Sequence, residues 1–145
     1  MPDTDAIEGR CLCGSVMITV KAAHDPRPGI CHCRMCQRWS GGVFMSFDAQ
    51  AEGVSVTGEV RSYRSSSFAE RAFCPVCGSH LWMRDLNGDS YDLMPGLFDA
   101  ASTWPLQSEI YTDQALAAVR LSGGHLRKTA AEYEATNPFV ERDPS

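Results

Sequence analysis

The chain lacks the long apolar runs of a membrane protein. None of its segments approaches the roughly 18 consecutive apolar residues of a membrane-spanning helix. The first residues, with the sequence MPDTDA, are acidic and have no apolar stretch like that of a secretory signal. We therefore expect a protein of the reducing cytoplasm, with no membrane partner, in which cysteines persist as thiols or metal ligands.

Basic charge is also scarce. The chain has 13 lysines and arginines against 18 acidic residues, which gives a net charge of −5 and an isoelectric point near 5.3. Because an acidic chain repels phosphate backbones, nucleic acid is not expected as a partner. The hydrophobic content of 43% in 145 residues is sufficient for a core that does not depend wholly on metal.

Helical patterns are few, and short β-like runs separated by turn residues predominate. These runs predict strands at residues 15–21, 43–47, 54–57, 60–64, 69–73, 81–84, 91–94 and 109–112. Gly58-Glu59 predicts a hairpin turn between the third and fourth of them. Short helices are predicted at residues 34–39 and 125–134. The pattern indicates a mostly β fold.

Cysteine is present in an informative arrangement. Seven cysteines form three clusters, Cys11-Leu12-Cys13, Cys31-His32-Cys33-Arg34-Met35-Cys36 and Cys74-Pro75-Val76-Cys77. An odd number cannot pair completely within one chain, and cysteines separated by one residue make strained disulfides. Two thiolates one to three residues apart instead form half of a tetrahedral metal site without straining the backbone. The pattern therefore favours metal binding over disulfides.

Two of the clusters end in a cysteine followed by a glycine. Cys13 and Cys77 are each followed by glycine, which suits the tight reversal of a zinc knuckle. This shared chemistry makes the two pairs natural partners in one closed zinc site. Its four ligands are predicted to be Cys11, Cys13, Cys74 and Cys77.

The central cluster supplies three further ligands, Cys31, Cys33 and Cys36. Three protein ligands leave the fourth position of a tetrahedral zinc open for water or an incoming thiol, as in a catalytic site. Three thiolates also make the zinc a weak Lewis acid, which suits holding sulfur better than splitting water. The set therefore predicts thiol chemistry, and the alternative is a second site without turnover.

His32 is a rival for the fourth position of this central site. In an extended Cys-His-Cys stretch its ring would point away from both cysteines, because side chains alternate. An outer-shell or surface role is therefore favoured over direct ligation. His24, His80 and His125 show no spacing that indicates a ligand.

The order of the motifs resembles a known family. The segments Gly9-x-Cys11-x-Cys13-Gly14, Cys31-His32-Cys33-x-x-Cys36 and Phe73-Cys74-x-x-Cys77-Gly78, with Glu109-Ile110-Tyr111 as a closing strand, are similar to those of the glutathione-dependent formaldehyde-activating enzymes. That domain is shared with centromere protein V. The resemblance implies a β-tent fold, in which small antiparallel sheets with few short helices surround the zinc sites. It also implies up to two zinc ions per chain, with Cys31, Cys33 and Cys36 at the catalytic one.

An activity is implied as well. The founding reaction of the family joins formaldehyde reversibly to glutathione and gives S-hydroxymethylglutathione, which is carbon–sulfur lyase chemistry. We therefore expect an enzyme that joins a small aldehyde to a thiol such as glutathione. Arg34 and Arg38 are either candidate partners for the carboxylates of glutathione or a solvated face. The alternative function is a non-catalytic, zinc-stabilised binding or chaperone-like module.

The chain departs from the family pattern at two places. Gln37 stands where a basic residue is common, and Ala117-Ala118-Val119 occupies the region of an expected tryptophan. The expected organisation is a flexible leader at residues 1–8, one zinc-binding domain at residues 9–135 and a flexible tail at residues 136–145. The oligomeric state is not predicted.

Overall fold

The computed structural model describes residues 5–140, and their contacts divide into two compact units. The first unit comprises residues 5–28 and 46–105, and the second comprises residues 29–45 and 106–140. The predicted leader and tail lie partly outside the described residues. Strand β1 (Ile7–Arg10) begins within the predicted leader. The domain limits stay a prediction.

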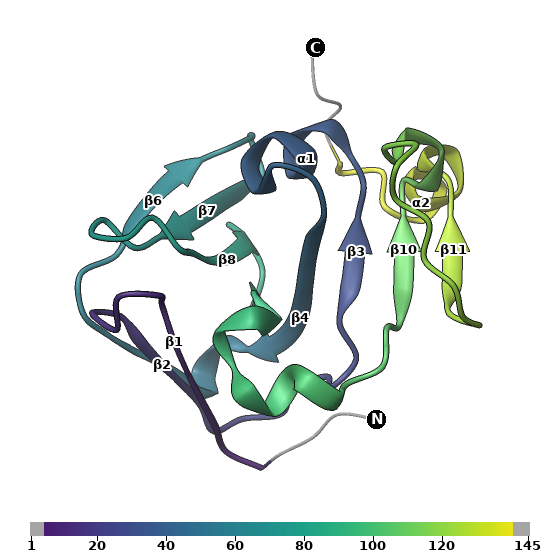
Figure 1. The fold of residues 1–145 in the computed structure, drawn as a ribbon. Helices are drawn as coiled ribbons and strands as arrows, with labels where there is room; N and C mark the ends of the chain where they lie inside the picture. Colours follow the sequence, from purple (N-terminus) through teal and green to yellow (C-terminus); the bar gives the residue numbers. More distant parts are fainter. Residues whose placement is uncertain (1–4, 141–145) are drawn as a thin grey trace. The chain divides into compact units, whose positions relative to one another are not determined.

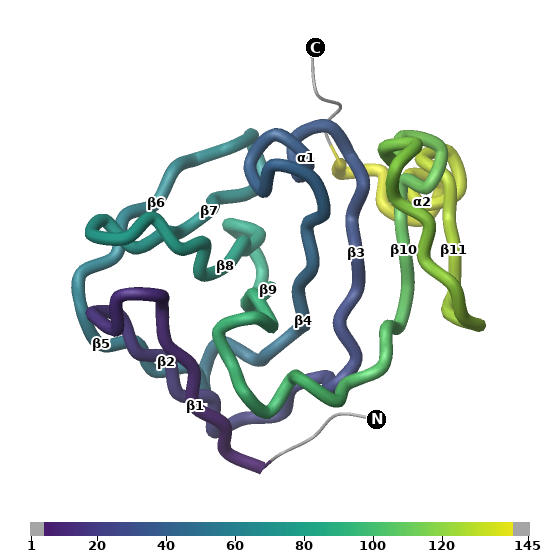
Figure 2. The backbone as a smooth tube through the Cα atoms, in the orientation of Figure 1, coloured from purple at the N-terminus to yellow at the C-terminus, as the bar shows by residue number. Residues whose placement is uncertain are grey.

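One sheet of the first unit contains β1, β2 (Met17–Val20) and β5 (Val54–Thr57), in the order β1-β2-β5 (Figure 2). Both pairings are antiparallel. The strand predicted at residues 15–21 is confirmed as β2, and Val16, Ile18 and Val20 on one face are fully buried. Burying every second side chain fixes the register of this strand against its neighbours.

A second run of antiparallel strands in this unit has the order β4-β9-β8-β7-β6. Their bounds are β4 (Phe44–Gln50), β6 (Arg61–Arg64), β7 (Ala69–Phe73), β8 (His80–Asp85) and β9 (Ser90–Leu93). Strands β7 and β8 form an antiparallel hairpin (Figure 1). Cys74 and Cys77 lie in the loop that joins them. Three short 3-10 helices complete the unit, η1 (Ala51–Gly53), η2 (Pro95–Leu97) and η3 (Asp99–Thr103).

Aromatic side chains fill much of the core of this unit. The ring of Phe47 meets those of Phe98 and Trp104 edge-on, with centroids 5.3 Å and 4.9 Å away. Edge-to-face contacts of this kind add to the free energy gained by burying the rings. Two cysteines, Cys11 and Cys74, belong to the same buried cluster. The two outer cysteine clusters thus contribute to the core.

The predicted hairpin between residues 54–57 and 60–64 is wrong. Strand β5 pairs with β2, whereas β6 pairs with β7. Gly58, between them, has a φ of 97° and passes close to the backbone of Ser15. Glycine is therefore needed here because the chain passes close to a segment that is distant in sequence. Local turn patterns cannot indicate such a contact.

Gly58→Ala is expected to lower the free energy of unfolding by about 3 kcal/mol. A Cβ there would lie 2.0 Å from the carbonyl oxygen of Ser15, and the positive φ adds strain. Urea unfolding followed by tryptophan fluorescence measures the loss. Gly96→Ala is the control from the same unit, because its Cβ would meet nothing within 4 Å. Equal midpoints for the two variants would contradict the expectation.

Two carboxylates face each other across β4 and β9, where Asp48 lies opposite Asp92. Burial, followed by the charges of Asp48 and Asp85, raises the pKa of Asp92 to about 7, although Arg71 opposes the shift. The folded state thus binds a proton more tightly than the unfolded state. Between about pH 4 and pH 7 the free energy of unfolding therefore falls as pH rises.

Asp92→Asn is expected to remove this pH dependence. At pH 8 the variant gains on the order of 1–2 kcal/mol over the wild type, because the charge repulsion is gone. At pH 4.5 the difference vanishes or reverses, since the native carboxyl is then protonated. Urea unfolding at both pH values measures the two differences. A constant difference between wild type and variant would contradict the assignment.

The second unit contains a parallel sheet. Strand β10 (Ser108–Ile110) lies between β3 (Gly29–Cys31) and β11 (Leu126–Lys128), and both pairings are parallel. Figure 1 shows these three strands side by side. The unit also contains α1 (Arg34–Ser40), the 3-10 helix η4 (Thr112–Gln114) and α2 (Ala130–Thr136). The parallel pairing differs from the antiparallel sheets that the family resemblance implied.

The first predicted helix is confirmed and the second is only partly correct. Helix α1 begins after Cys33 and ends at Gly41, whose φ is 88°. In the predicted helix 125–134, residues Leu126–Lys128 instead form β11. Thr129 and Glu132 make a capping box that starts α2 at Ala130. The predicted helix therefore starts too early, because its first residues belong to a strand.

The mostly β class with few short helices is confirmed, with eleven strands and two α-helices among residues 5–140. Within the same residues, neither helix has the length or the apolar character needed to cross a membrane.

Candidate functional site

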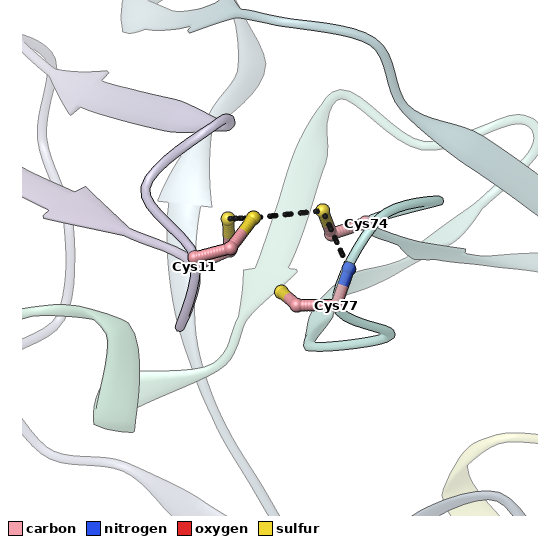
Figure 3. A group of neighbouring side chains, drawn as sticks. Cys11, Cys74 and Cys77 are labelled. Atoms are coloured by element: carbon pink, nitrogen blue, oxygen red, sulfur yellow. Dashed lines mark hydrogen bonds between the residues drawn. The ribbon is translucent and has the colours of Figure 1, made fainter.

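The first cysteine set lies entirely in the first unit and is called the quartet, Cys11, Cys13, Cys74 and Cys77. Cys11 and Cys13 follow β1, and Cys74 and Cys77 lie in the loop between β7 and β8. The four sulfurs all lie within 4.8 Å of one another. Figure 3 shows Cys11, Cys74 and Cys77 pointing toward a common centre from the two loops. The structure thus brings together the four residues that were predicted to share a site.

The sulfur separations fit a tetrahedral metal ion. Cys13 Sγ lies 3.6 Å from Cys11 Sγ and 3.8 Å from Cys74 Sγ. Sulfurs bonded to one zinc at about 2.3 Å are about 3.8 Å apart, whereas a disulfide would need about 2.05 Å. Four thiol donors in this arrangement are compatible with zinc. The quartet could therefore hold one such ion.

Two serines that the sequence reasoning missed contact the quartet. Ser15 Oγ lies 3.1 Å from Cys13 Sγ and 3.3 Å from Cys74 Sγ, and Ser79 Oγ lies 3.2 Å from Cys77 Sγ. Hydroxyl groups can donate to thiolates and so disperse their charge. The signal was available, since the triplet Cys-Gly-Ser occurs at residues 13–15 and again at 77–79.

Hydrogen bonds favour the charged form of two quartet cysteines. The hydroxyl and backbone of Ser79 lower the pKa of the Cys77 thiol to about 5. Burial opposes ionisation of Cys11, but the backbone of Val16, together with neighbouring side chains, leaves its pKa lowered. Because a metal binds the thiolate and not the thiol, these contacts prepare Cys11 and Cys77 for a cation.

The second cysteine set lies in the second unit and is called the trio, Cys31, Cys33 and Cys36. Cys31 ends β3, Cys33 caps α1, and Cys36 lies in its first turn. The Sγ of Cys33 accepts a hydrogen bond from the backbone N of Cys36 at 3.5 Å. The three sulfurs lie within 4.8 Å of one another. This compact group of three donors could hold a metal ion and leave a fourth direction open.

The trio thiols cannot all ionise together without a compensating charge. Hydrogen bonds and charges from Cys33 and Cys36, with burial, raise the pKa of Cys31 well above its ordinary value. A divalent cation at the centre of the trio would relieve this repulsion. The donor set therefore fits the metal that the sequence predicted.

His32 is buried away from the trio and does not form part of it. Its side chain is 1% exposed, and its Nε2 lies 2.7 Å from Glu109 Oε1. Of the two roles predicted for His32, a buried residue beside the ligands fits this placement. A surface residue does not. The second contact of Glu109 is His125, whose Nε2 lies 2.5 Å from Oε2. Sequence reasoning missed this role of His125, because a contact across 16 residues has no local signal.

Gln37, which departs from the family pattern, holds backbone groups beside the trio. Its Nε2 donates to the carbonyl oxygens of His32 and Gln114 at 2.6 Å and 2.7 Å. Arg34 and Arg38 are exposed on α1, and Ala117 and Ala118 are exposed in the loop after η4. Gln37 is thus a structural link, whereas the two arginines face solvent.

Tyr111 lies near the trio in an uncommon backbone conformation. Its φ is 57°, and its hydroxyl donates to Glu134 Oε2 at 3.0 Å. Burial, then Glu134, and to a lesser degree the charges of Cys31 and Cys33 raise the pKa of its hydroxyl. A non-glycine residue in this region is held there by its surroundings, and such residues often accompany functional sites.

Comparisons with known proteins show the family to which the chain belongs. The sequence profile of the family described as glutathione-dependent formaldehyde-activating enzyme matches residues 6–114. An uncharacterized lyase of Schizosaccharomyces pombe is 34% identical over 108 residues, which is 73% of this chain and 78% of the relative. The chain belongs to the glutathione-dependent formaldehyde-activating enzyme family.

Two further proteins are similar at a lower sequence identity. A Halomonas elongata protein named "Putative glutathione-dependent formaldehyde-activating enzyme" is 32% identical over 88 residues, covering 54% of this chain and 56% of that protein. The crystal structure of a Rhodobacter sphaeroides protein superposes with a TM-score of 0.55 at 21% identity, covering 83% of this chain and 99% of that one. The structural likeness supports the fold alone, whereas the named relatives support a lyase-type enzyme.

Proposed function

We propose that the chain is a zinc-dependent carbon–sulfur lyase-type enzyme that joins formaldehyde reversibly to a thiol such as glutathione. The observation that carries the proposal is the separation of seven cysteines into a group of four and a group of three. Family membership and the named lyase relatives support the class of reaction. The partners are accordingly a small-molecule thiol and a small aldehyde, in the cytoplasm.

The two cysteine sets have different roles in this proposal. Cys11, Cys13, Cys74 and Cys77 would hold a structural zinc. Cys31, Cys33 and Cys36 would hold a catalytic zinc, whose charge would favour the thiolate form of a substrate thiol at neutral pH. In the reaction a carbon–sulfur bond forms, the carbonyl electron pair moves to oxygen, and the proton lost by the thiol ends on that oxygen.

Residues around the trio supply orientation. Arg34 and Arg38 are exposed on the helix that carries Cys36, where their guanidinium groups can pair with the carboxylates of glutathione. Holding the thiol next to the aldehyde provides most of the acceleration, because the addition itself is intrinsically easy. Glutathione should accordingly react faster than a neutral thiol of similar pKa.

Exchange spectroscopy of formaldehyde with glutathione tests the proposal. The exchange rate is measured with the zinc-loaded protein, with protein stripped by a chelator, and without protein. Acceleration by the loaded protein alone is expected. Equal rates in all three samples would remove the proposed reaction for this pair of substrates.

The alternative is a non-catalytic binding module, and one observation favours it. Leu12 and Val76 lie between the quartet cysteines of the two loops and are 82% and 72% exposed. Exposed apolar side chains on metal-supported loops can serve as contacts for a partner. Under this alternative the loaded protein leaves the exchange rate unchanged.

A further inference from the structure

Glu109 is a buried carboxylate shared by two imidazole rings. Its Oε1 accepts a hydrogen bond from His32 Nε2 and its Oε2 accepts one from His125 Nε2, with Arg127 Nε 3.5 Å from Oε2. Glu109 is 6% exposed and His32 is 1% exposed. An ionised carboxylate can only accept, so the ring nitrogens that face it carry the protons. The position of the acidic group thereby sets the tautomer of His32.

The backbone N–H and the carbonyl oxygen of His32 are also hydrogen-bonded. Its N–H donates to the carbonyl oxygen of Ile110 at 3.0 Å, and its own carbonyl oxygen accepts from Gln37 Nε2 at 2.6 Å. Together with the bond from the ring to Glu109, these contacts restrain both the backbone and the side chain of His32. His32 is the residue between two members of the trio.

The pairing of β3 with β10 explains how this affects the thiols. Glu109 lies opposite Ile30, and in an extended strand Ile30 and His32 face the same side. Glu109 therefore draws the His32 ring to its own side of the sheet. Cys31 and Cys33 are then directed to the opposite side, where their sulfurs lie within 4.8 Å of each other and of Cys36.

We propose that Glu109 is a positioning residue for the trio, which acts through the His32 ring to direct Cys31 and Cys33 toward one cation. The inference rests on the proposed metal-binding role of the trio, but not on the identity of thiol or aldehyde. Burying a carboxylate with its partners carries a large desolvation cost, and an apolar group would serve stability as well. We therefore attribute the presence of Glu109 to its contact with the His32 ring.

Glu109→Gln in the full chain tests the inference, because an amide keeps the shape but cannot accept from both rings. Zinc affinity is measured by competition with a chromophoric chelator, and cobalt is used to record thiolate-to-metal absorption. The trio is expected to lose 10–100-fold in affinity, as is typical when an outer-shell partner is removed. The quartet, in the same molecule, is expected to stay within about twofold of the wild type and serves as internal control.

His125→Gln is the matched control, since it changes a partner on the other oxygen of the same carboxylate. It should leave the affinity and cobalt spectrum of the trio close to those of the wild type. Wild-type affinity of the trio in Glu109→Gln would overturn the inference. Equal weakening of both metal sites would overturn it too, because a general loss of structure would then be the cause.

His32→Leu is the second variant if Glu109→Gln fails to fold. It removes the ring but leaves Glu109 bonded to His125, so the same selective loss at the trio is expected. An unchanged trio would refute the role of the ring. If the wild-type chain binds no second cation, both the inference and the proposed zinc binding by the trio are overturned.

The proposed reaction can fail independently of this inference. Metal affinities are measured without thiol or aldehyde, so a selective loss in Glu109→Gln supports the positioning role even if no exchange is accelerated. Conversely, the wild type could accelerate exchange while the trio of Glu109→Gln keeps its metal affinity. That result would support the proposed reaction and would contradict the positioning role of Glu109.

Discussion

Cys74→Ser is expected to cost the protein about 4 kcal/mol or more of its free energy of unfolding. The Cys74 side chain is fully buried in the core of the first unit, and its Sγ lies 3.8 Å from that of Cys13. Structural zinc contributes on the order of 10 kcal/mol in small zinc peptides, and a chain with its own core depends on it less. Serine is a poor zinc ligand, so the variant loses the quartet ion and leaves a hydroxyl in the core.

Urea unfolding followed by circular dichroism, with zinc content measured in parallel, checks this expectation. Val76→Ala is the control from the same loop, since Val76 is 72% exposed and offers no ligand. The zinc content of Cys74→Ser should fall by one ion per chain. A wild-type protein whose unfolding midpoint is unmoved by a strong chelator would contradict the structural role of the quartet.

Cys36→Ser is expected to reduce formaldehyde–glutathione exchange to the rate without protein. The Cys36 side chain is 2% exposed. The trio contains three cysteines, so no other cysteine of the group can replace Cys36 as a ligand. With two thiolates left, the second zinc dissociates and the substrate thiol loses its position. Exchange spectroscopy and zinc content measure the two losses, and the content should fall from two ions to one.

Met35→Ser is the control for this variant. It introduces the same residue one position earlier in α1 and leaves the trio intact. Its exchange rate and zinc content should match those of the wild type. Retention of accelerated exchange by Cys36→Ser would rule out the trio as the catalytic centre.

Local patterns in the sequence predicted the features that depend on neighbouring residues. The β-like runs at residues 15–21, 69–73 and 81–84 located β2, β7 and β8. The clustering of thiols followed from their spacing, because two cysteines a few residues apart already share a loop. The cysteine–glycine step shared by Cys13 and Cys77 indicated that the two outer pairs form one group, and the roles of the quartet and the trio stay a prediction.

Features that depend on distant pairing were missed. Nothing near Gly58 indicates that β5 pairs with β2, and nothing near Glu109 indicates two histidines as partners. Strands of three residues, such as β3 and β11, are too short for an alternating pattern. Their existence depends on parallel pairing with β10, which is a tertiary interaction.

The quartet joins residues as far apart as Cys13 and Cys74, and the trio lies within the stretch of chain that it closes. If both sets bind metal as proposed, an ion that bridges sulfurs of different sets before folding would have to be released before the native groups can form. We therefore expect excess free metal to slow refolding of the chain.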